Sequence, residues 1–135
     1  MMTRYQRLRN AVAILAAPPE QQAEYLDQLF VPCTGGGSAE AYGNDELVLG
    51  LDDIFAARGH MMDFGELKAS EIAVIEPLND LFLAYSQPVD VAFWKREALF
   101  DDARWQTVRD IATNVLSQLP NEARESDYTR GLEDG

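Results

Sequence analysis

Apolar residues recur every three or four positions along most of this chain, and no convincing stretch alternates apolar with polar residues. The three-and-four spacing places apolar side chains on one face of an α-helix, whereas alternation is typical of a half-buried strand. The clearest apolar stripes are Tyr5-Leu8-Val12-Leu15, Leu47-Leu51-Ile54-Phe55 and Trp105-Val108-Ala112-Val115-Leu116-Leu119. We therefore expect an all-α fold, an irregular bundle of five or six helices.

Two adjacent prolines separate the first two helices. A helix over residues 3–17, with Thr3 as its N-cap, ends at Pro18-Pro19, which donate no backbone hydrogen bonds. Pro19 suits the first position of a second helix that runs to Phe30. The buried side of this second helix is predicted to carry Tyr25, Leu26, Leu29 and Phe30.

A loop over residues 31–43 should follow, because Pro32 and the run Gly35-Gly36-Gly37-Ser38 interrupt helical patterns. The glycine run is no phosphate-binding loop, since no Lys-Ser or Lys-Thr pair follows it and no strand precedes it. The next helix starts at Asn44 or Asp45, and it is expected to end near Gly59.

The second half of the chain predicts two more long helices. One covers residues 66–85, with an apolar surface wide enough for a central helix and a kink or break caused by Pro77. A turn at 86–88 and a short helix within 91–100 separate it from the last helix, which Asp101 or Asp102 caps and which Pro120 stops. We expect one domain over residues 1–120 and a polar, mobile tail over residues 121–135.

Net charge is the most unusual property of the composition. The 135 residues carry a formal charge of −12, which disfavours nucleic-acid phosphates and anionic membranes and attracts basic partners. The single cysteine, Cys33, fits a reducing compartment. No run approaches the roughly 20 apolar residues that span a bilayer. We expect a cytoplasmic protein that binds neither nucleic acid nor membrane.

Four carboxylates lie within the segment NDELVLGLDDIF, residues 44–55. Residues seven apart nearly eclipse on a helix, so Asp45 and Asp52 share one stripe while Glu46 and Asp53 share the adjacent one. Gly50 and Ala57 keep this side low in profile. The segment is either a solvated outer face or a surface that accepts arginine or lysine side chains.

Metal and catalytic sites are poorly supported by the sequence. Helical di-iron and di-manganese sites commonly use Glu-x-x-His pairs, which are absent from a chain whose one histidine is His60. His60 fits an ordinary, partly buried histidine. No serine-hydrolase, Cys-x-x-Cys or His-Glu-x-x-His motif occurs. We predict no catalytic residue, no metal ligand and no cofactor, although a carboxylate-only magnesium site remains open.

The order of several features resembles a loose group of small helical bacterial proteins. These are the immunity proteins of contact-dependent growth inhibition and related polymorphic toxin systems. The resemblance covers roughly residues 20–119 and rests on spacing and residue type. Its features are Asp45-Glu46-Leu47 with Asp52-Asp53, a long apolar helix, Trp94 with Glu97-Ala98-Leu99, and Trp105-Gln106-Thr107-Val108-Arg109 with Ala112 and Leu116.

This resemblance implies a non-catalytic, cytoplasmic binding protein that neutralises a cognate toxin C-terminal domain with a basic surface. It is expected to act as a monomer or homodimer. An acidic face can mimic the charge of a nucleic-acid substrate and speed the encounter. The expected toxin-binding residues are Asp45, Glu46, Asp52 and Asp53, with Glu40 and Asp63 from the flanking segments.

Two alternatives come from other classes of protein. A small acidic adaptor would homodimerise through exposed apolar or aromatic residues and use its charge for solubility. A carboxylate-dependent metal enzyme would act on a small phosphate compound.

Overall fold

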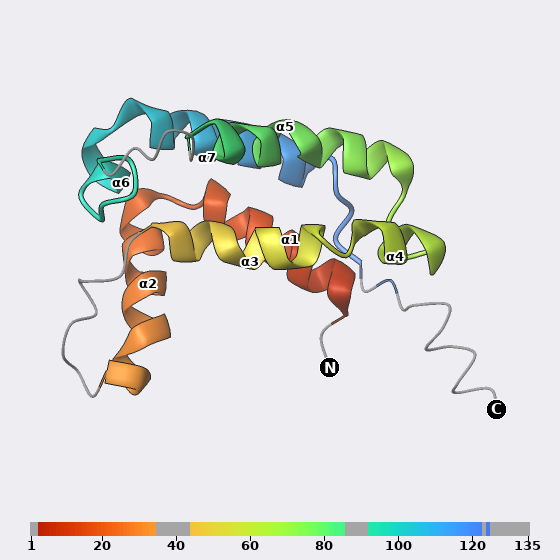
Figure 1. Ribbon diagram of the computed structural model, residues 1–135, viewed down its shortest axis with the longest axis horizontal. Helices are drawn as coiled ribbons and strands as arrows, with labels where there is room; N and C mark the ends of the chain where they lie inside the picture. Colours follow the sequence, from red (N-terminus) through yellow and green to blue (C-terminus); the bar gives the residue numbers. More distant parts are fainter. Residues whose placement is uncertain (1–2, 35–43, 86–91, 123, 125–135) are drawn as a thin grey trace.

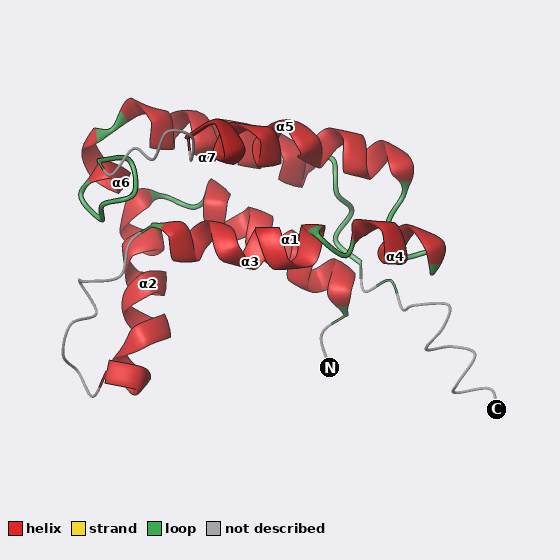
Figure 2. Ribbon diagram, viewed as in Figure 1, coloured by secondary structure: helices red, strands yellow, loops and turns green. Residues whose placement is uncertain are grey.

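The protein is all-α over the residues that the computed structural model describes, which are 3–34, 44–85, 92–122 and 124. Side chains are described there except at 29–34. The helices are α1 (Arg4–Ala16), α2 (Pro19–Thr34), α3 (Asp45–Phe55), α4 (Arg58–Asp63), α5 (Ala69–Tyr85), α6 (Ala98–Asp101) and α7 (Ala103–Ser117). Because α4 and α6 are short, the five long helices agree with the expected bundle (Figure 2).

Helix α1 is the centre of the bundle. It packs most extensively against α7 on one side and α3 on the other. Figure 1 shows α5 and α7 forming one layer and α1 and α3 the other, with α2 projecting away from both layers. The prediction that the helix before Tyr85 would be central was wrong, because the apolar surface of α5 packs mainly on α7.

The start of α1 follows the sequence closely. Thr3 accepts a hydrogen bond from the Gln6 backbone N–H, and the Gln6 side chain accepts one from Thr3 N–H, which makes a capping box. The predicted stripe is fully buried at Tyr5, Leu8, Val12 and Leu15. These four side chains anchor the domain core.

Two predicted boundaries of the first half were wrong. Helix α2 opens at Pro19 as expected, but it continues through Pro32 to Thr34. Pro32 lies in the last turn, where losing one backbone hydrogen bond does not stop a helix. Helix α3 ends at Phe55 instead of near Gly59, and Gly59 lies in a separate helix, α4. The rest of the predicted loop, residues 35–43, lies outside the described residues.

Gly65 decides where α5 begins. Its φ of 76° is in the left-handed region, and the Glu66 backbone N–H that follows donates to Met61 O at 2.8 Å. This pattern closes α4 in the manner of a glycine-terminated helix. Helix α5 therefore begins at Ala69, three residues later than predicted, and it runs without a break through Pro77.

Asn44 occupies the N-cap position of α3, but its side chain does not cap the helix. It precedes α3, but its fully buried side chain makes no capping hydrogen bond. Its Nδ2 instead donates to Phe93 O at 3.2 Å and to Lys95 O at 2.6 Å, and its backbone N–H donates to Trp94 O. The start of α3 is thereby tied to a segment 50 positions away along the chain.

The predicted helix over 91–100 reduces to turns and the four-residue α6. The Phe93 carbonyl accepts hydrogen bonds from Trp105 Nε1 at 2.8 Å and from Asn44 Nδ2. These donors, distant in sequence, bind the carbonyl that would otherwise accept a backbone hydrogen bond within a local helix. Phe93 stacks on Trp105 with 4.7 Å between ring centroids, and half-buried Trp94 meets both rings edge-on. The turn predicted at 86–88 lies outside the described residues.

Helix α7 begins and ends close to the predicted positions. The Asp102 side chain caps it by accepting from the Arg104 backbone N–H at 2.9 Å. The helix ends at Ser117, and Leu119 is buried just before Pro120. None of the helices in the described part of the chain combines the length and the apolar character needed to cross a bilayer.

Candidate functional site

Helix α3 positions the predicted acidic residues. Leu47, Leu51 and Phe55 are buried, which turns the opposite side of the helix outward. Asp45, Asp52 and Asp53 are exposed, and within the described residues their carboxylates form no hydrogen bond or ion pair. We call these three carboxylates, with the exposed Leu49 between them, the α3 face.

Glu46 differs from the other three acids because it is half-buried. Burial raises the pKa of Glu46, and the neighbouring charge of Asp45 raises it further. The predicted quartet is therefore three exposed carboxylates and one partly desolvated carboxyl group.

The two flanking candidates do not join the α3 face. Glu40 lies outside the described residues, and Asp63 is the exposed last residue of another helix, α4. Within α3 itself, Asp45 and Asp53 are eight positions apart, or about 12 Å along the helix axis. The carboxylates thus form an extended line of charge rather than a cluster around one point.

Several carboxylates outside α3 have cationic partners. Glu66 pairs with Arg4, Asp102 with Arg104 at 2.7 Å, and Asp27 with Arg96 at 2.8 Å. These pairs join elements of the fold or close local turns. The carboxylates of the α3 face have no such internal role.

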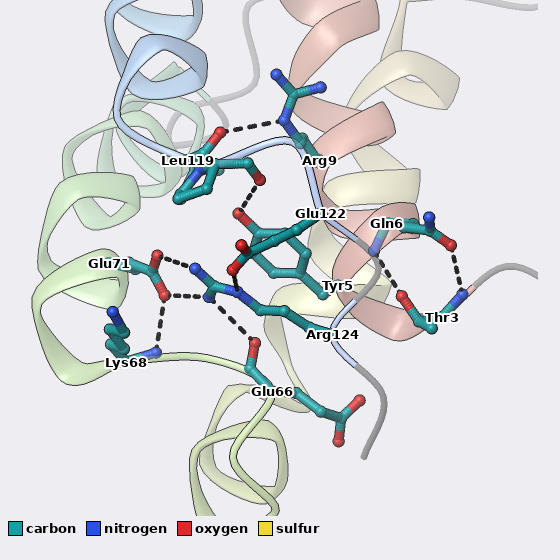
Figure 3. Close-up of polar contacts among 11 residues, drawn as sticks. Thr3, Tyr5, Gln6, Arg9, Glu66, Lys68, Glu71, Leu119, Glu122 and Arg124 are labelled. Carbon is teal, nitrogen blue, oxygen red and sulfur yellow. Dashed lines mark hydrogen bonds and ion pairs between the residues drawn. The ribbon is translucent and has the colours of Figure 1, made fainter.

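Arg124 is the centre of an ionic cluster (Figure 3). Its guanidinium binds both oxygens of Glu71 at 2.6 and 2.8 Å and lies 4.0 Å from the centre of the Tyr5 ring. Tyr5 in turn donates its hydroxyl to Pro120 O at 2.6 Å. Arg124, within the predicted tail, is therefore bound to the domain, and residues 123 and 125–135 lie outside the described residues.

A pocket that the sequence analysis missed lies beside the α3 face. Its volume is about 320 Å³, and it is open to solvent between α1 and α3 with α2 at one end. We call it the α1–α3 groove. Its lining residues are Arg7, Asn10, Ala11, Ile14, Tyr25, Leu47, Gly50, Asp53 and Ile54.

Tyr25 was predicted on the buried side of α2, but 38% of its surface is exposed. Leu26 is buried as predicted, whereas the spacing of Tyr25 and Leu26 does not determine how far neighbouring helices cover α2. Leu29 and Phe30, also predicted on the buried side, lie where side chains are not described. The sequence signal for the groove was Gly50, a glycine in the middle of a helix.

The other candidate groups from the sequence are placed without a shared site. His60 is exposed on α4 rather than partly buried, and Cys33 is in the last turn of α2, where side chains are not described. Among the described residues, no group of three or more His, Cys, Asp or Glu side chains is arranged to hold a metal ion. Trp105 is a core residue, as its spacing predicted.

A scan against protein-family models found no match, and searches of the curated proteins and of the solved structures found none either.

Proposed function

We propose that this chain is a non-catalytic immunity protein, which binds and neutralises a cognate toxin domain through the α3 face. The observation that carries the proposal is the exposure of Asp45, Asp52 and Asp53 on one rigid helix, without cationic partners among the described residues. Exposed carboxylates on a preformed helix suit the recognition of arginine and lysine side chains. The net charge of −12 would also draw in a basic partner.

Leu49 adds an apolar contact to the same surface. It lies four residues after Asp45 and three before Asp52, and 43% of its surface is exposed. Protein interfaces commonly combine an apolar centre with a polar rim. Charge at the rim speeds association, while a desolvated centre slows dissociation. The proposal places the protein in the cytoplasm of the toxin-producing cell.

The test begins with recovery of the partner from the cells that make this protein, with the intact chain as bait. The C-terminal domain of the recovered protein is then expressed alone and together with the bait. The immunity proposal predicts that this domain arrests growth alone and that the wild-type chain restores growth. A recovered domain that leaves growth unaffected contradicts it.

Charge reversal then locates the surface. The triple variant Asp45→Lys/Asp52→Lys/Asp53→Lys should bind the toxin domain at least 100-fold more weakly, about 3 kcal/mol, because several charge-assisted contacts are lost. The matched control reverses three exposed carboxylates on other helices, Glu76→Lys/Asp80→Lys/Asp101→Lys. Equal losses in the two variants would mean that only net charge matters, and the α3 face would not be the interface.

A homodimeric adaptor is the second candidate. Leu83 in α5 and Phe100 in α6 are 57% and 56% exposed, so each could contribute apolar area to an interface between two copies. Sedimentation at increasing protein concentration tests this function. A mass that stays monomeric throughout contradicts the adaptor.

A further inference from the structure

The α1–α3 groove has the dimensions of a site for one long side chain. Its volume of about 320 Å³ is at the lower end of the roughly 300–1,000 Å³ that is usual for small-molecule pockets. Its apolar surface comes from Ala11 and Ile14 of α1 and from Leu47 and Ile54 of α3. Asp53 supplies a carboxylate, and the half-exposed ring of Tyr25 closes the α2 end.

Gly50 keeps this groove open. Glycine in a helix interior is destabilising relative to alanine, so a structural requirement would be expected for it. The fold shows no structural requirement for glycine at position 50. A Cβ built on Gly50 meets no atom within 4 Å, and among the described residues the glycine with positive φ is Gly65 rather than Gly50. The missing side chain instead leaves room beside Asp53 for an atom that is not part of this chain.

The chemistry of the lining selects the occupant. We propose that the α1–α3 groove receives an arginine side chain of the partner protein, with its guanidinium on Asp53 and its aliphatic stem over Gly50. The inference rests on the proposed function and names the partner group that the α3 face recognises. Arginine fits better than lysine because a planar, weakly hydrated guanidinium binds carboxylates bidentately and stacks on aromatic rings such as Tyr25.

Arg7 sharpens the prediction because it lines the same groove with the opposite charge. A cation on Arg7 repels an incoming guanidinium, so Arg7→Gln should tighten arginine binding severalfold. An anionic occupant would show the reverse effect. The direction of this change therefore separates a site for cations from a site for anions.

The first experiment uses N-acetylarginine amide as the probe and follows the backbone amide signals of the full chain by NMR. We expect saturable shifts that centre on Gly50, Asp53 and Ala11. The neutral isostere N-acetylcitrulline amide should bind at least tenfold more weakly. Shifts that spread over all the acidic segments, or equal binding of the two probes, would overturn the proposal.

Two substitutions with matched controls test the groove itself. Gly50→Leu fills it without changing charge, and Asp53→Asn removes the carboxylate without changing shape. Each should weaken binding of the arginine probe at least tenfold. Gly59→Leu, at another open glycine, and Asp80→Asn, at another exposed carboxylate, should leave binding unchanged. Unchanged binding in Gly50→Leu and Asp53→Asn would refute the groove as the site, and a thermal melt confirms that every variant is folded.

The recovered toxin domain separates this inference from the proposed function. Loss of binding in Gly50→Leu, with retention in Gly59→Leu, supports the groove. Binding that survives Gly50→Leu but is lost on reversal of Asp45, Asp52 and Asp53 overturns the groove and leaves the proposed function standing. Binding that survives both changes overturns both. A concentration-dependent dimer that Gly50→Leu abolishes would assign the groove to a second copy and overturn the inference.

Discussion

Gln22 lies fully buried between three helices. Its Nε2 donates to Ile14 O at 3.0 Å and to Leu15 O at 3.1 Å, two carbonyls in the last turn of α1. Ile14 O also accepts from the Ala17 backbone N–H at 3.3 Å. Its Oε1 accepts from Arg109 Nε at 3.1 Å. Burial lowers the pKa of Arg109. The negative charges of nearby Glu20 and Asp110 partly offset this lowering. One neutral side chain therefore satisfies both the end of α1 and a buried guanidinium of α7.

Replacing Gln22 should be strongly destabilising. Gln22→Leu removes the hydrogen-bond partners of the buried Arg109 Nε–H and of the Leu15 carbonyl, so we expect the unfolding free energy to fall by about 3 kcal/mol. Urea unfolding measures this change. Gln21→Leu, on the adjacent exposed residue, should alter stability by no more than about 0.5 kcal/mol. Similar midpoints for the two variants would contradict the assignment.

Arg124 is a second residue whose importance comes from distant contacts. Its backbone φ of 49° is in the left-handed region, which a residue with a side chain occupies only when its surroundings hold it there. Burial by itself raises the pKa of Glu71, but hydrogen bonds from Arg124 and from the Lys68 backbone N–H, with the charge of Arg124, lower it overall. Hydrogen bonding to Glu71 raises the pKa of Arg124, against the effect of burial.

The Glu71–Arg124 ion pair makes the unfolding free energy depend on pH in the acidic range. Because the folded pKa of Glu71 is below its ordinary value of 4.5, its contribution is complete above pH 4.5 and is lost as pH falls through the folded value. Arg124→Met should destabilise the protein by about 3 kcal/mol at neutral pH and raise the pKa of Glu71. Urea unfolding over a pH series and NMR titration of Glu71 measure the two effects.

Arg58 provides the control for Arg124. It is exposed and stacks on Phe55 at 4.6 Å from the ring centre, without a carboxylate partner among the described residues. Arg58→Met should therefore change stability by less than about 1 kcal/mol. An unchanged acid profile in Arg124→Met would mean that the ion pair does not contribute to folding.

At the scale of the element, α3 combines a well-packed inner side with an outer side that the fold does not need. Leu47, Leu51 and Phe55 hold the helix in place, while Gly50 weakens it. Gly50→Ala should raise unfolding free energy by about 0.5–1 kcal/mol, because alanine has the higher helix propensity and its Cβ enters open space. A thermal melt gives the measurement.

Gly59 is the matching position in a weaker element. A Cβ there also meets no atom within 4 Å, but Gly59 is the second residue of the six-residue α4. Gly59→Ala should therefore gain less than Gly50→Ala, since propensity counts most in helix interiors. A destabilised Gly50→Ala would show that the outer side of α3 is packed in a way that its open surroundings do not indicate.

At the scale of the whole molecule, charge works against compactness. With a formal net charge of −12 on 135 residues, the excess carboxylates repel one another, and salt screens that repulsion. We expect Tm to rise as NaCl increases from about 20 to about 300 mM, because the Debye length falls from roughly 20 to roughly 6 Å. Largely buried pairs such as Arg124–Glu71 are screened much less. A Tm that falls with salt would mean that exposed ion pairs outweigh repulsion.

The sequence by itself determined the type of structure and much of the core. Helical spacing identified the buried stripes of α1, α3 and α7, because the hydrophobic effect acts on every helix in the same periodic way. Thr3, Pro19 and Asp102 marked helix starts correctly, because these N-terminal signals act over a few residues. The acidic side of α3 was also visible, because seven-residue spacing fixes which residues share a helix face.

Only the tertiary structure decided which helix is central, what covers each apolar surface and where the groove lies. The Asn44 side chain donates hydrogen bonds to the Phe93 and Lys95 carbonyls rather than capping its own helix, and Arg124 binds Glu71 rather than solvent. Tyr25 is half-exposed because neighbouring elements leave it uncovered. Each of these outcomes depends on partners about 50 or more positions away or on a neighbouring helix, and spacing within one segment carries no information about them.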